Sequence, residues 1–206
     1  MAEKSMTIAY SVGDKLYLNL TNKCPCACIF CIRNNGDGAY GSDPLWLEHE
    51  PSLEEIKAAI KKADPSKYTE IVFCGYGEPT EVMELLCSTA DFIKQNYNDI
   101  PTRLNTNGLS DFINKKPTAH LLKGRIDTVS VSLNAATKDE YLRVTRPKFG
   151  EDSFKEMQRF AAECKKYVKK VMFTIVDILP KEEIEQSKAL AEKLGIGLRI
   201  REYIEE

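Results

Sequence analysis

Four cysteines, Cys24, Cys26, Cys28 and Cys31, lie within a short segment near the start of the chain. The whole chain holds 7 cysteines but only 2 histidines, so thiolates are the metal ligands available in number. The odd number of cysteines and the polar start of the chain argue against a secreted disulfide framework. A tight group of thiols in a reducing compartment typically binds metal, and soft sulfur suits an iron–sulfur cluster or zinc. The sequence therefore predicts a thiolate metal site.

The spacing of these cysteines favours an iron–sulfur cluster over zinc. Cys24, Cys28 and Cys31 follow the pattern C-x3-C-x2-C, and three thiolates on one short loop can converge on one face of a cluster. Structural zinc needs four ligands, commonly in two pairs. The fourth would have to be Cys26, which is crowded between Cys24 and Cys28, or the distant Cys74. Three ligands on a four-iron cluster leave one iron open, which implies chemistry rather than a structural role.

The composition is that of an ordinary globular protein. The chain has 206 residues and a net charge of −2, with 43% hydrophobic residues. We therefore expect a single domain over residues 1–206 with a real core. The balanced charge argues against nucleic-acid binding, and no apolar run is long enough for a membrane span. We expect a cytoplasmic protein.

Short β-rich runs alternate with helical segments, as in parallel β-α units. Helix starts are predicted at three capping boxes, which begin at Ser52, Thr137 and Ser153, and at a cap on Thr80. The last helix is expected to follow Pro180 and to end at Gly195. The predicted strands cover residues 15–20, 70–74, 102–105, 127–133, 170–177 and 196–200.

The strands alternate apolar and polar residues, which indicates how the sheet closes. Val129 and Val131 lie on one face of the fourth predicted strand, opposite Ser130 and Ser132. An open parallel sheet is covered on both faces and reads as continuous apolar runs, whereas alternation indicates helices on one face and a polar interior on the other. The chain is too short for a complete eight-unit barrel. We therefore favour an incomplete (β/α)6 barrel of the TIM type over a flat α/β sheet.

The cysteine motif, with Phe30 directly before the last cysteine, resembles the signature of the radical S-adenosylmethionine (SAM) superfamily. The resemblance implies a radical SAM core that holds a 4Fe–4S cluster through Cys24, Cys28 and Cys31, with SAM chelating the remaining iron. It also implies that an electron from a reductant such as flavodoxin or ferredoxin cleaves SAM. The products are methionine and a 5′-deoxyadenosyl radical that abstracts a substrate hydrogen atom. Cys26 departs from the pattern and is interpreted as a bystander, unless it replaces Cys24 as a ligand.

The segment Cys-Gly-Tyr-Gly-Glu-Pro-Thr follows the second predicted strand. A dinucleotide loop is the weaker interpretation, because the third glycine is missing and Glu78 would bring negative charge toward phosphate. The better one is a bent strand end whose backbone groups and carboxylate receive a cationic amine. The segment resembles the Gly-Gly-Glu motif of radical SAM proteins, with a tyrosine replacing the second glycine. The resemblance implies that the SAM amino group is bound by Gly75, Tyr76, Gly77, Glu78 and Pro79.

Polar residues also end the third and fourth predicted strands. Around Asn107 the sequence reads as an ordinary Asn-Gly turn, but a similar Thr-Asn-Gly segment lies near the cofactor in radical SAM relatives. The fourth strand places hydroxyl and amide groups on its inner face, where they can contact the ribose of SAM. The residues so implied in SAM binding are Asn105, Thr106, Asn107, Ser130, Ser132 and Asn134.

Arginines are candidates for binding the SAM carboxylate. In the superfamily an arginine from the helix after the fourth strand often has this role, and Arg143 and Arg146 both qualify, with a surface salt bridge as the alternative for each. Arg199 and Arg201 point from the last strand toward the predicted interior, where a guanidinium needs a partner. The partner is either a carboxylate such as Glu202, an anionic substrate or the SAM carboxylate. We expect Arg199→Leu to abolish product formation without preventing cluster assembly.

Together the motifs, from the first strand to Tyr203, resemble the TatD-associated radical SAM proteins, which are found beside genes for TatD-type nucleases. The resemblance suggests a functional link to such a nuclease but names no substrate, which is either a small molecule or a peptide. Two alternatives stay open. One is an activating enzyme that installs a glycyl radical on a partner protein, and the other is a non-catalytic binding module stabilised by zinc or an iron–sulfur cluster.

Overall fold

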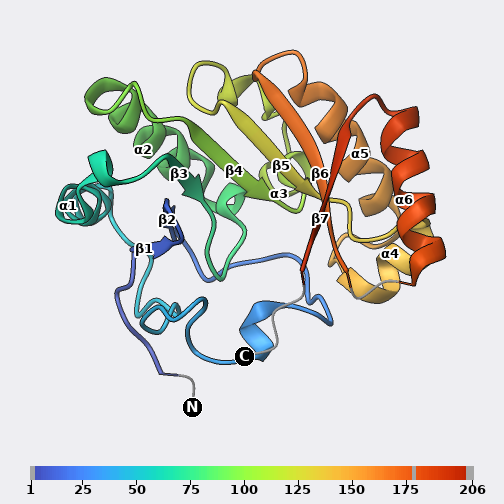
Figure 1. Cartoon of the computed structure of the whole chain (residues 1–206), viewed down its shortest axis with the longest axis horizontal. Coiled ribbons are helices and arrows are strands. Elements are labelled where there is room, and N and C mark those ends of the chain that lie inside the picture. The colour runs from blue at the N-terminus through green and yellow to red at the C-terminus, as the bar shows by residue number, and fades with distance from the viewer. Residues whose placement is uncertain (1–2, 178–179, 203–206) are drawn as a thin grey trace.

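The computed structural model describes residues 3–177 and 180–202 (Figure 1). Tyr203, where the family resemblance ends, lies outside these residues. No helix in the described part of the chain is long and apolar enough to cross a lipid bilayer.

One sheet of seven strands runs through the described residues, and the strands are ordered as in the sequence. The first two strands form an antiparallel hairpin, and all later neighbours are parallel. The strands are β1 (Ala9–Val12), β2 (Lys15–Leu18), β3 (Glu70–Phe73), β4 (Thr102–Thr106), β5 (Thr128–Ser132), β6 (Lys170–Val176) and β7 (Gly197–Arg201).

The six predicted strands are confirmed as β2 to β7, with ends that differ by a few residues. The prediction lacks β1. This strand pairs with β2 through a two-residue turn, in which Gly13 has a φ of 58° and is followed by Asp14. The added hairpin makes the sheet mostly parallel rather than wholly parallel.

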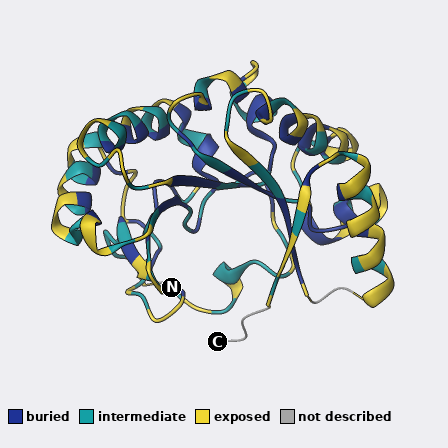
Figure 2. Cartoon of the chain, turned by 45° about the horizontal axis from the view of Figure 1, so that its top comes forward, coloured by how far each residue is buried: buried dark blue, intermediate teal, exposed yellow. Residues whose placement is uncertain are grey.

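The helices cover the outer side of the curved sheet. Figure 2 shows the strands as an arc that is lined by helices outside and is not closed into a ring. The predicted incomplete barrel is therefore confirmed. The helices are α1 (Leu53–Ala63), α2 (Met83–Asn96), α3 (Ser110–Asn114), α4 (Lys138–Thr145), α5 (Ser153–Cys164) and α6 (Lys181–Lys193).

The alternation along the strands separates an apolar outer layer from a polar inner face. Leu16 and Leu18 on β2 and Val129 and Val131 on β5 are fully buried and belong to the core between strands and helices. Because successive side chains of a strand point to opposite faces, the residues between them line the inside of the arc. The polar groups at the strand ends therefore face one shared interior.

Two of the predicted helix starts are confirmed and two are wrong. Ser52 forms the reciprocal capping box of α1, and Thr137 caps α4 by accepting from the backbone N–H of Glu140. Thr80 does not cap α2, because a 3-10 turn (η3, Pro79–Val82) intervenes and α2 begins at Met83.

At α5 the predicted capping box is also wrong. Ser153 is the first helical residue and its hydroxyl has no hydrogen-bond partner among the described residues. The carboxylate of Glu156, the other half of the predicted box, pairs with Arg159 instead. At the end of α6, Gly195 adopts a φ of 61°, which confirms the predicted stop.

Candidate functional site

Cys24, Cys26, Cys28 and Cys31 lie on the loop that follows β2, called the cysteine loop below. This loop leaves β2 at the carboxyl end of the parallel strands, where barrels place their sites. This loop is held by main-chain hydrogen bonds to the end of α4 and the segment that follows. Because α4 follows β5, the loop crosses the end of the sheet from β2 to the helix that comes after β5. The bonds run from Ala27 N to Thr145 O (3.0 Å), from Ile29 N to Val144 O (2.9 Å) and from Lys148 N to Pro25 O (2.8 Å).

Three of the loop sulfurs contact one another. The thiol of Cys26 is hydrogen-bonded to Cys24 and to Cys28. These hydrogen bonds lower the pKa of Cys24 and of Cys28 against the effect of burial. The same two contacts raise the pKa of Cys26. The proton is therefore favoured on Cys26 over Cys24 and Cys28.

The thiol of Cys31 is paired with Arg33. The Arg33 Nε donates to Cys31 Sγ (3.2 Å), and its Nη2 donates to the carbonyl of Cys26 (3.4 Å). Burial alone would lower the pKa of Arg33, but the hydrogen bond to Cys31 and the neighbouring thiolates raise it. Arg33 is not among the residues predicted from the sequence. The one sequence feature that could have indicated it is its position two residues after Cys31, the last cysteine of the motif.

The donor chemistry of the cysteine loop suits an iron–sulfur cluster. No three His, Cys, Asp or Glu side chains within residues 3–177 and 180–202 are arranged to share one metal ion. A structural zinc site requires such an arrangement. The thiolates of an iron–sulfur cluster bind different irons, so they need not converge on a point. Three half-buried thiols beside one guanidinium therefore fit this group by their chemistry.

Gly75 and Gly77 allow the segment after β3, residues 74–80, to lie directly against the end of β2. These residues are called the glycine segment below. A Cβ on Gly75 would stand 2.1 Å from Asn19 Oδ1, and a Cβ on Gly77 would stand 2.2 Å from the carbonyl oxygen of Thr21. No side chain fits at such distances. Glycine is thus required at both positions for this predicted SAM-binding segment to approach the cysteine loop.

Glu78 joins that segment to the loop after β4. Its side chain is buried, and burial raises its pKa while hydrogen bonds lower it. The Oε1 atom accepts from the hydroxyls of Thr80 and Thr106 (2.8 Å each) and from Thr80 N (3.1 Å), and Oε2 accepts from Asn107 N (2.7 Å). The backbone N–H of Glu78 donates to the carbonyl of Lys23, next to Cys24 (2.8 Å). The carboxylate therefore accepts four hydrogen bonds from the protein and links the segment after β3 to the loop after β4.

The side chain of Tyr76 holds the long loop over residues 33–51. Its hydroxyl lies 2.8 Å from the carbonyl oxygens of both Gly36 and Gly38. Its ring meets Trp46 edge-on with centroids 5.1 Å apart. The side chain of Tyr76 thus contacts this long loop, and only its backbone belongs to the predicted SAM-binding segment between Gly75 and Gly77.

The residues at the end of β4 connect three parts of the site. Thr106 binds Glu78, whereas the side-chain amide of Asn107 donates to Cys26 Sγ (3.8 Å). Asn105 is hydrogen-bonded to the thiol of Cys74, and its buried Oδ1 has no partner among the described residues. The loop after β4 therefore touches both the glycine segment and the cysteine loop.

At the end of β5, Ser130 and Ser132 lie on the inner face, and Asn134 follows with a φ of 61°. The buried Oδ1 of Asn134 has no hydrogen-bond partner in the described part of the chain. Buried acceptors are normally satisfied, so this oxygen is available to a ligand.

The arginine candidates are placed differently. Arg143 lies exposed on α4 and pairs with Glu140, so the structure does not bring it to the other predicted residues. Arg146 follows α4 in a left-handed conformation, beside the residues that dock the cysteine loop. Arg199 lies on the inner face of β7, in register with Thr174 of β6.

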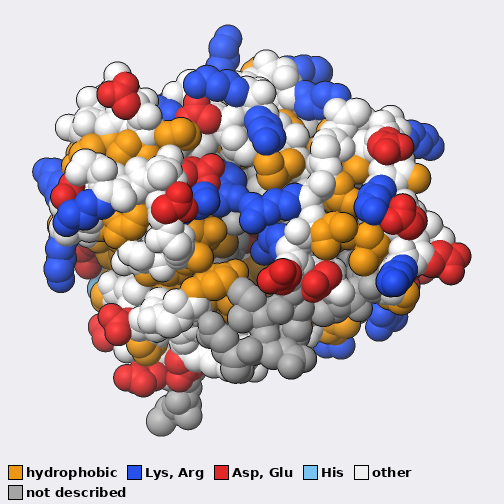
Figure 3. Space-filling view, viewed as in Figure 1, with side chains coloured by type: hydrophobic (Ala, Val, Ile, Leu, Met, Phe, Trp, Pro, Cys, Tyr) orange, Lys and Arg blue, Asp and Glu red, His pale blue; other side chains and the backbone are white. Residues whose placement is uncertain are grey.

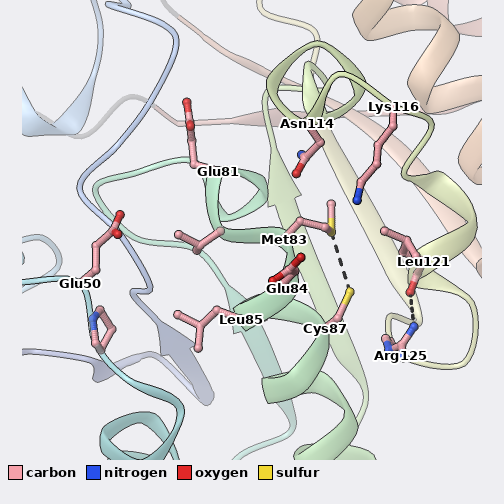
Figure 4. A pocket seen from close by; sticks show the side chains of 12 residues that line it. Glu50, Glu81, Met83, Glu84, Leu85, Cys87, Asn114, Lys116, Leu121 and Arg125 are labelled. Carbon is pink, nitrogen blue, oxygen red and sulfur yellow. Dashed lines mark hydrogen bonds between the residues drawn. The ribbon is translucent and has the colours of Figure 1, made fainter.

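A cavity of about 630 Å³ lies apart from these residues, between the segment after β3 and the region of α3 (Figure 4). Its lining includes Glu81, Glu84, Cys87, Lys116 and Arg125. None of the predicted cluster or SAM ligands contributes to it. This cavity is therefore separate from the predicted site at the strand ends.

Comparison with solved structures shows the same fold in proteins of low identity. A radical SAM methyltransferase from Sphaerobacter thermophilus is 16% identical with a TM-score of 0.55, and the match covers 94% of this chain and 68% of that one. The protein anSMEcpe with bound AdoMet is 17% identical with a TM-score of 0.63, covering 91% of this chain and 50% of that one. The structure of anSMEcpe with AdoMet and the Cp18Cys peptide is 18% identical with a TM-score of 0.61, and the match covers 92% of this chain and 50% of that one. This chain thus spans about half the length of anSMEcpe.

No curated protein matches the sequence significantly. The family profile described as the Radical SAM superfamily matches residues 18–194. That range includes the cysteine loop, the glycine segment and the polar ends of β4 and β5, which the fold gathers at one end of the sheet. The chain belongs to the Radical SAM superfamily.

Proposed function

We propose that this chain is an enzyme that binds a 4Fe–4S cluster through Cys24, Cys28 and Cys31 and binds SAM at the adjoining strand ends. One observation carries the proposal. Glu78 and Asn107 tie the cysteine loop, the glycine segment and the loop after β4 into one hydrogen-bonded group. Such a group is more than a single metal ion requires for structural support.

When bound, the cluster would deliver the electron that cleaves SAM to methionine and a 5′-deoxyadenosyl radical for hydrogen abstraction. The protein's own part is to hold and tune it. Arg33 offsets thiolate charge at Cys31, and Cys26 keeps its proton beside Cys24 and Cys28. Half-burial of the three ligands limits the access of water.

The SAM amino group is assigned to the backbone of the glycine segment rather than to the Glu78 carboxylate. That carboxylate already accepts from four donors, so its work is to hold Gly75, Tyr76, Gly77 and Pro79 in place. The ribose and the remaining polar groups of SAM are assigned to the neighbouring strand ends. The residues proposed there are Asn105, Thr106, Asn107, Ser130, Ser132 and Asn134.

For the SAM carboxylate, the placement favours Arg199 and Arg146 over Arg143. All three side chains are exposed, but Arg199 lies on the inner face of β7 and Arg146 adjoins the cysteine loop, whereas Arg143 is paired with Glu140. An arginine is suited to this partner because its planar fork matches a carboxylate.

The electron donor is proposed to be a small redox protein such as flavodoxin or ferredoxin. The substrate is proposed to be a small molecule or a peptide, the latter in view of the likeness to anSMEcpe with its bound peptide. A functional link to a TatD-type nuclease rests on the motifs that resemble the TatD-associated family.

The test is anaerobic reconstitution with iron and sulfide, followed by SAM and dithionite. We expect the absorbance of an iron–sulfur cluster and the formation of 5′-deoxyadenosine, detected by mass spectrometry. Cys28→Ala should reduce the product to background, and Cys87→Ala, a half-buried thiol on α2, should not. A zinc-stabilised binding module would instead yield neither the absorbance nor the nucleoside, and that result would reject the proposal.

A further inference from the structure

Arg103 is a buried cation on the inner face of β4, nearer to the start of the strand than the predicted SAM residues. It is 6% exposed. Its Nη2 lies 3.1 Å from Glu70 Oε2 and 3.4 Å from the hydroxyl of Tyr17. Its Nε has no hydrogen-bond partner among the described residues. A buried guanidinium normally has all its donors satisfied, so this N–H lacks an acceptor.

Arg201 lies on the inner face of β7, three strands along the sheet from β4, and this inner side of the arc is called the inner wall. Its Nε is also buried and has no partner within the described residues. The charges of Arg201 and of Arg103 both act on Cys74, which follows β3, and lower its pKa against the effect of burial. The charges of two guanidinium groups from separate strands, β4 and β7, therefore both reach this thiol.

Two further groups complete this wall. Asn105 lies two residues after Arg103 on the same face, and its buried Oδ1 is unpartnered in the described part of the chain. Arg199 lies two residues before Arg201 on the inner face of β7. In Figure 3 a band of Lys and Arg side chains crosses the middle of the molecule between the positions of β3 and β7.

The wall has a local excess of positive charge in a protein whose net charge is −2. Within residues 3–177 and 180–202, Glu70 is the one carboxylate that forms an ion pair with these arginines. Glu78 also lies near Cys74, and its oxygens accept from the neutral donors of Thr80, Thr106 and Asn107 rather than from either arginine. Arg103 is buried and Arg201 is half-buried, so one paired carboxylate for two such guanidinium groups leaves positive charge that a bound anion would offset.

We propose that Arg103 and Arg201 bind an oxyanion of the substrate, a carboxylate or a phosphate group, on the inner wall formed by β3, β4 and β7. The planar forks of the two arginines suit such a group, and Arg103 presents an unpartnered Nε–H beside the Nη2 that contacts Glu70. The assignment of this anion to a substrate rests on the proposed function, whereas the anion site itself does not.

The test is calorimetric titration of the reconstituted protein with inorganic phosphate and, separately, with acetate, at constant ionic strength and with SAM present but no reductant. We expect Arg201→Gln to weaken binding of the preferred anion by about tenfold or more, since charge-assisted hydrogen bonds are lost. Glu70→Gln should strengthen binding, because it removes the carboxylate that competes for Arg103. Lys188→Gln, an equal change of charge on the surface of α6, should have no effect.

Comparison of the two anions identifies the class, phosphate or carboxylate. The inference is overturned if neither anion binds, if Arg201→Gln binds as the wild type does, or if Glu70→Gln weakens binding. It is also overturned if saturating SAM abolishes binding, because the arginines would then belong to the SAM site. Failure to form 5′-deoxyadenosine with the expected anion pattern intact would reject the proposed enzymatic function and leave the anion site standing.

Discussion

The guanidinium of Arg33 places positive charge beside the predicted cluster ligands. It donates to Cys31 Sγ and contacts the cysteine loop a second time through the carbonyl of Cys26. Hydrogen bonds to cluster sulfurs and nearby positive charge stabilise the reduced form, which carries one more negative charge. Arg33 is therefore expected to raise the reduction potential of the cluster.

Replacing this arginine tests the expectation. Arg33→Met should lower the midpoint potential by an amount on the order of tens of millivolts, and Arg33→Lys should lower it less. The measurement is a redox titration followed by EPR, with Arg125→Met, which removes a surface guanidinium paired with Asp91, as the control. A potential that is equal in all four proteins would show that Arg33 has no electrostatic role.

At the level of single residues, the sequence was informative about types and spacing but not about contacts. Cys24, Cys28 and Cys31 could be picked out because their spacing is local. The role of Arg33 could not, because its contacts depend on how the loop folds back. Nor could the ring of Tyr76 be placed, since its partners lie 40 and 38 residues away.

Among the elements, the contact between the glycine segment and the end of β2 depends on two missing side chains. Gly77→Ala would place a Cβ 2.2 Å from the carbonyl oxygen of Thr21. Backbone must then shift, and overpacking of this kind costs about 1–3 kcal/mol. We expect a loss of that size in the free energy of unfolding by urea.

The matched control is Gly197→Ala on β7, where a Cβ meets nothing within 4 Å and φ is ordinary. It should leave the unfolding free energy nearly unchanged. Equal losses in the two variants would contradict the close approach of the two segments.

Asp127, just before β5, connects three elements through its carboxylate. It accepts from Lys94 of α2 (2.5 Å), Lys169 (2.7 Å) and the backbone N–H of Thr102 on β4 (2.9 Å). Burial alone would raise the pKa of Asp127, but these partners lower it below its ordinary value of 3.8. A depressed pKa means that the stabilisation is present above that value and is lost as the pH falls.

Asp127→Asn should therefore lower the unfolding free energy near neutral pH by about 1 kcal/mol and flatten its decline below pH ~4. Thermal unfolding from pH 2 to 7 measures both effects. Asp99→Asn, at an exposed position before β4, provides the baseline. An unchanged slope in Asp127→Asn would show that this carboxylate does not link folding to pH.

Element types were more predictable than element ends. The β2 to β7 order follows from alternation and helix signals, which are local. The Gly13-Asp14 turn was a usable hairpin signal for β1 that the prediction did not use. The false cap at Thr80 arose because Glu78, held by the loop after β4, takes the Thr80 hydroxyl and N–H. That competition is tertiary and cannot be read from spacing.

At the scale of the whole molecule, the incomplete barrel was predictable because polar and apolar residues alternate along its strands. The path of the cysteine loop across the end of the sheet to α4 was not, since main-chain hydrogen bonds to Val144 and Thr145 leave no sequence signal. The single domain over residues 1–206 stays a prediction. The open arc, with its band of cations inside, is the setting for both the proposed SAM site and the anion site (Figures 2 and 3).

The most direct test of the central claim is the EPR spectrum of the reduced, reconstituted protein, recorded with and without SAM. If Cys24, Cys28 and Cys31 hold a 4Fe–4S cluster with one open iron, SAM should change the g values of its signal. Each single alanine variant of the three should lose the signal, and Cys26→Ala should keep both the signal and its response to SAM. A signal that SAM leaves unchanged, or one that depends on Cys26 but not on Cys24, would contradict this account.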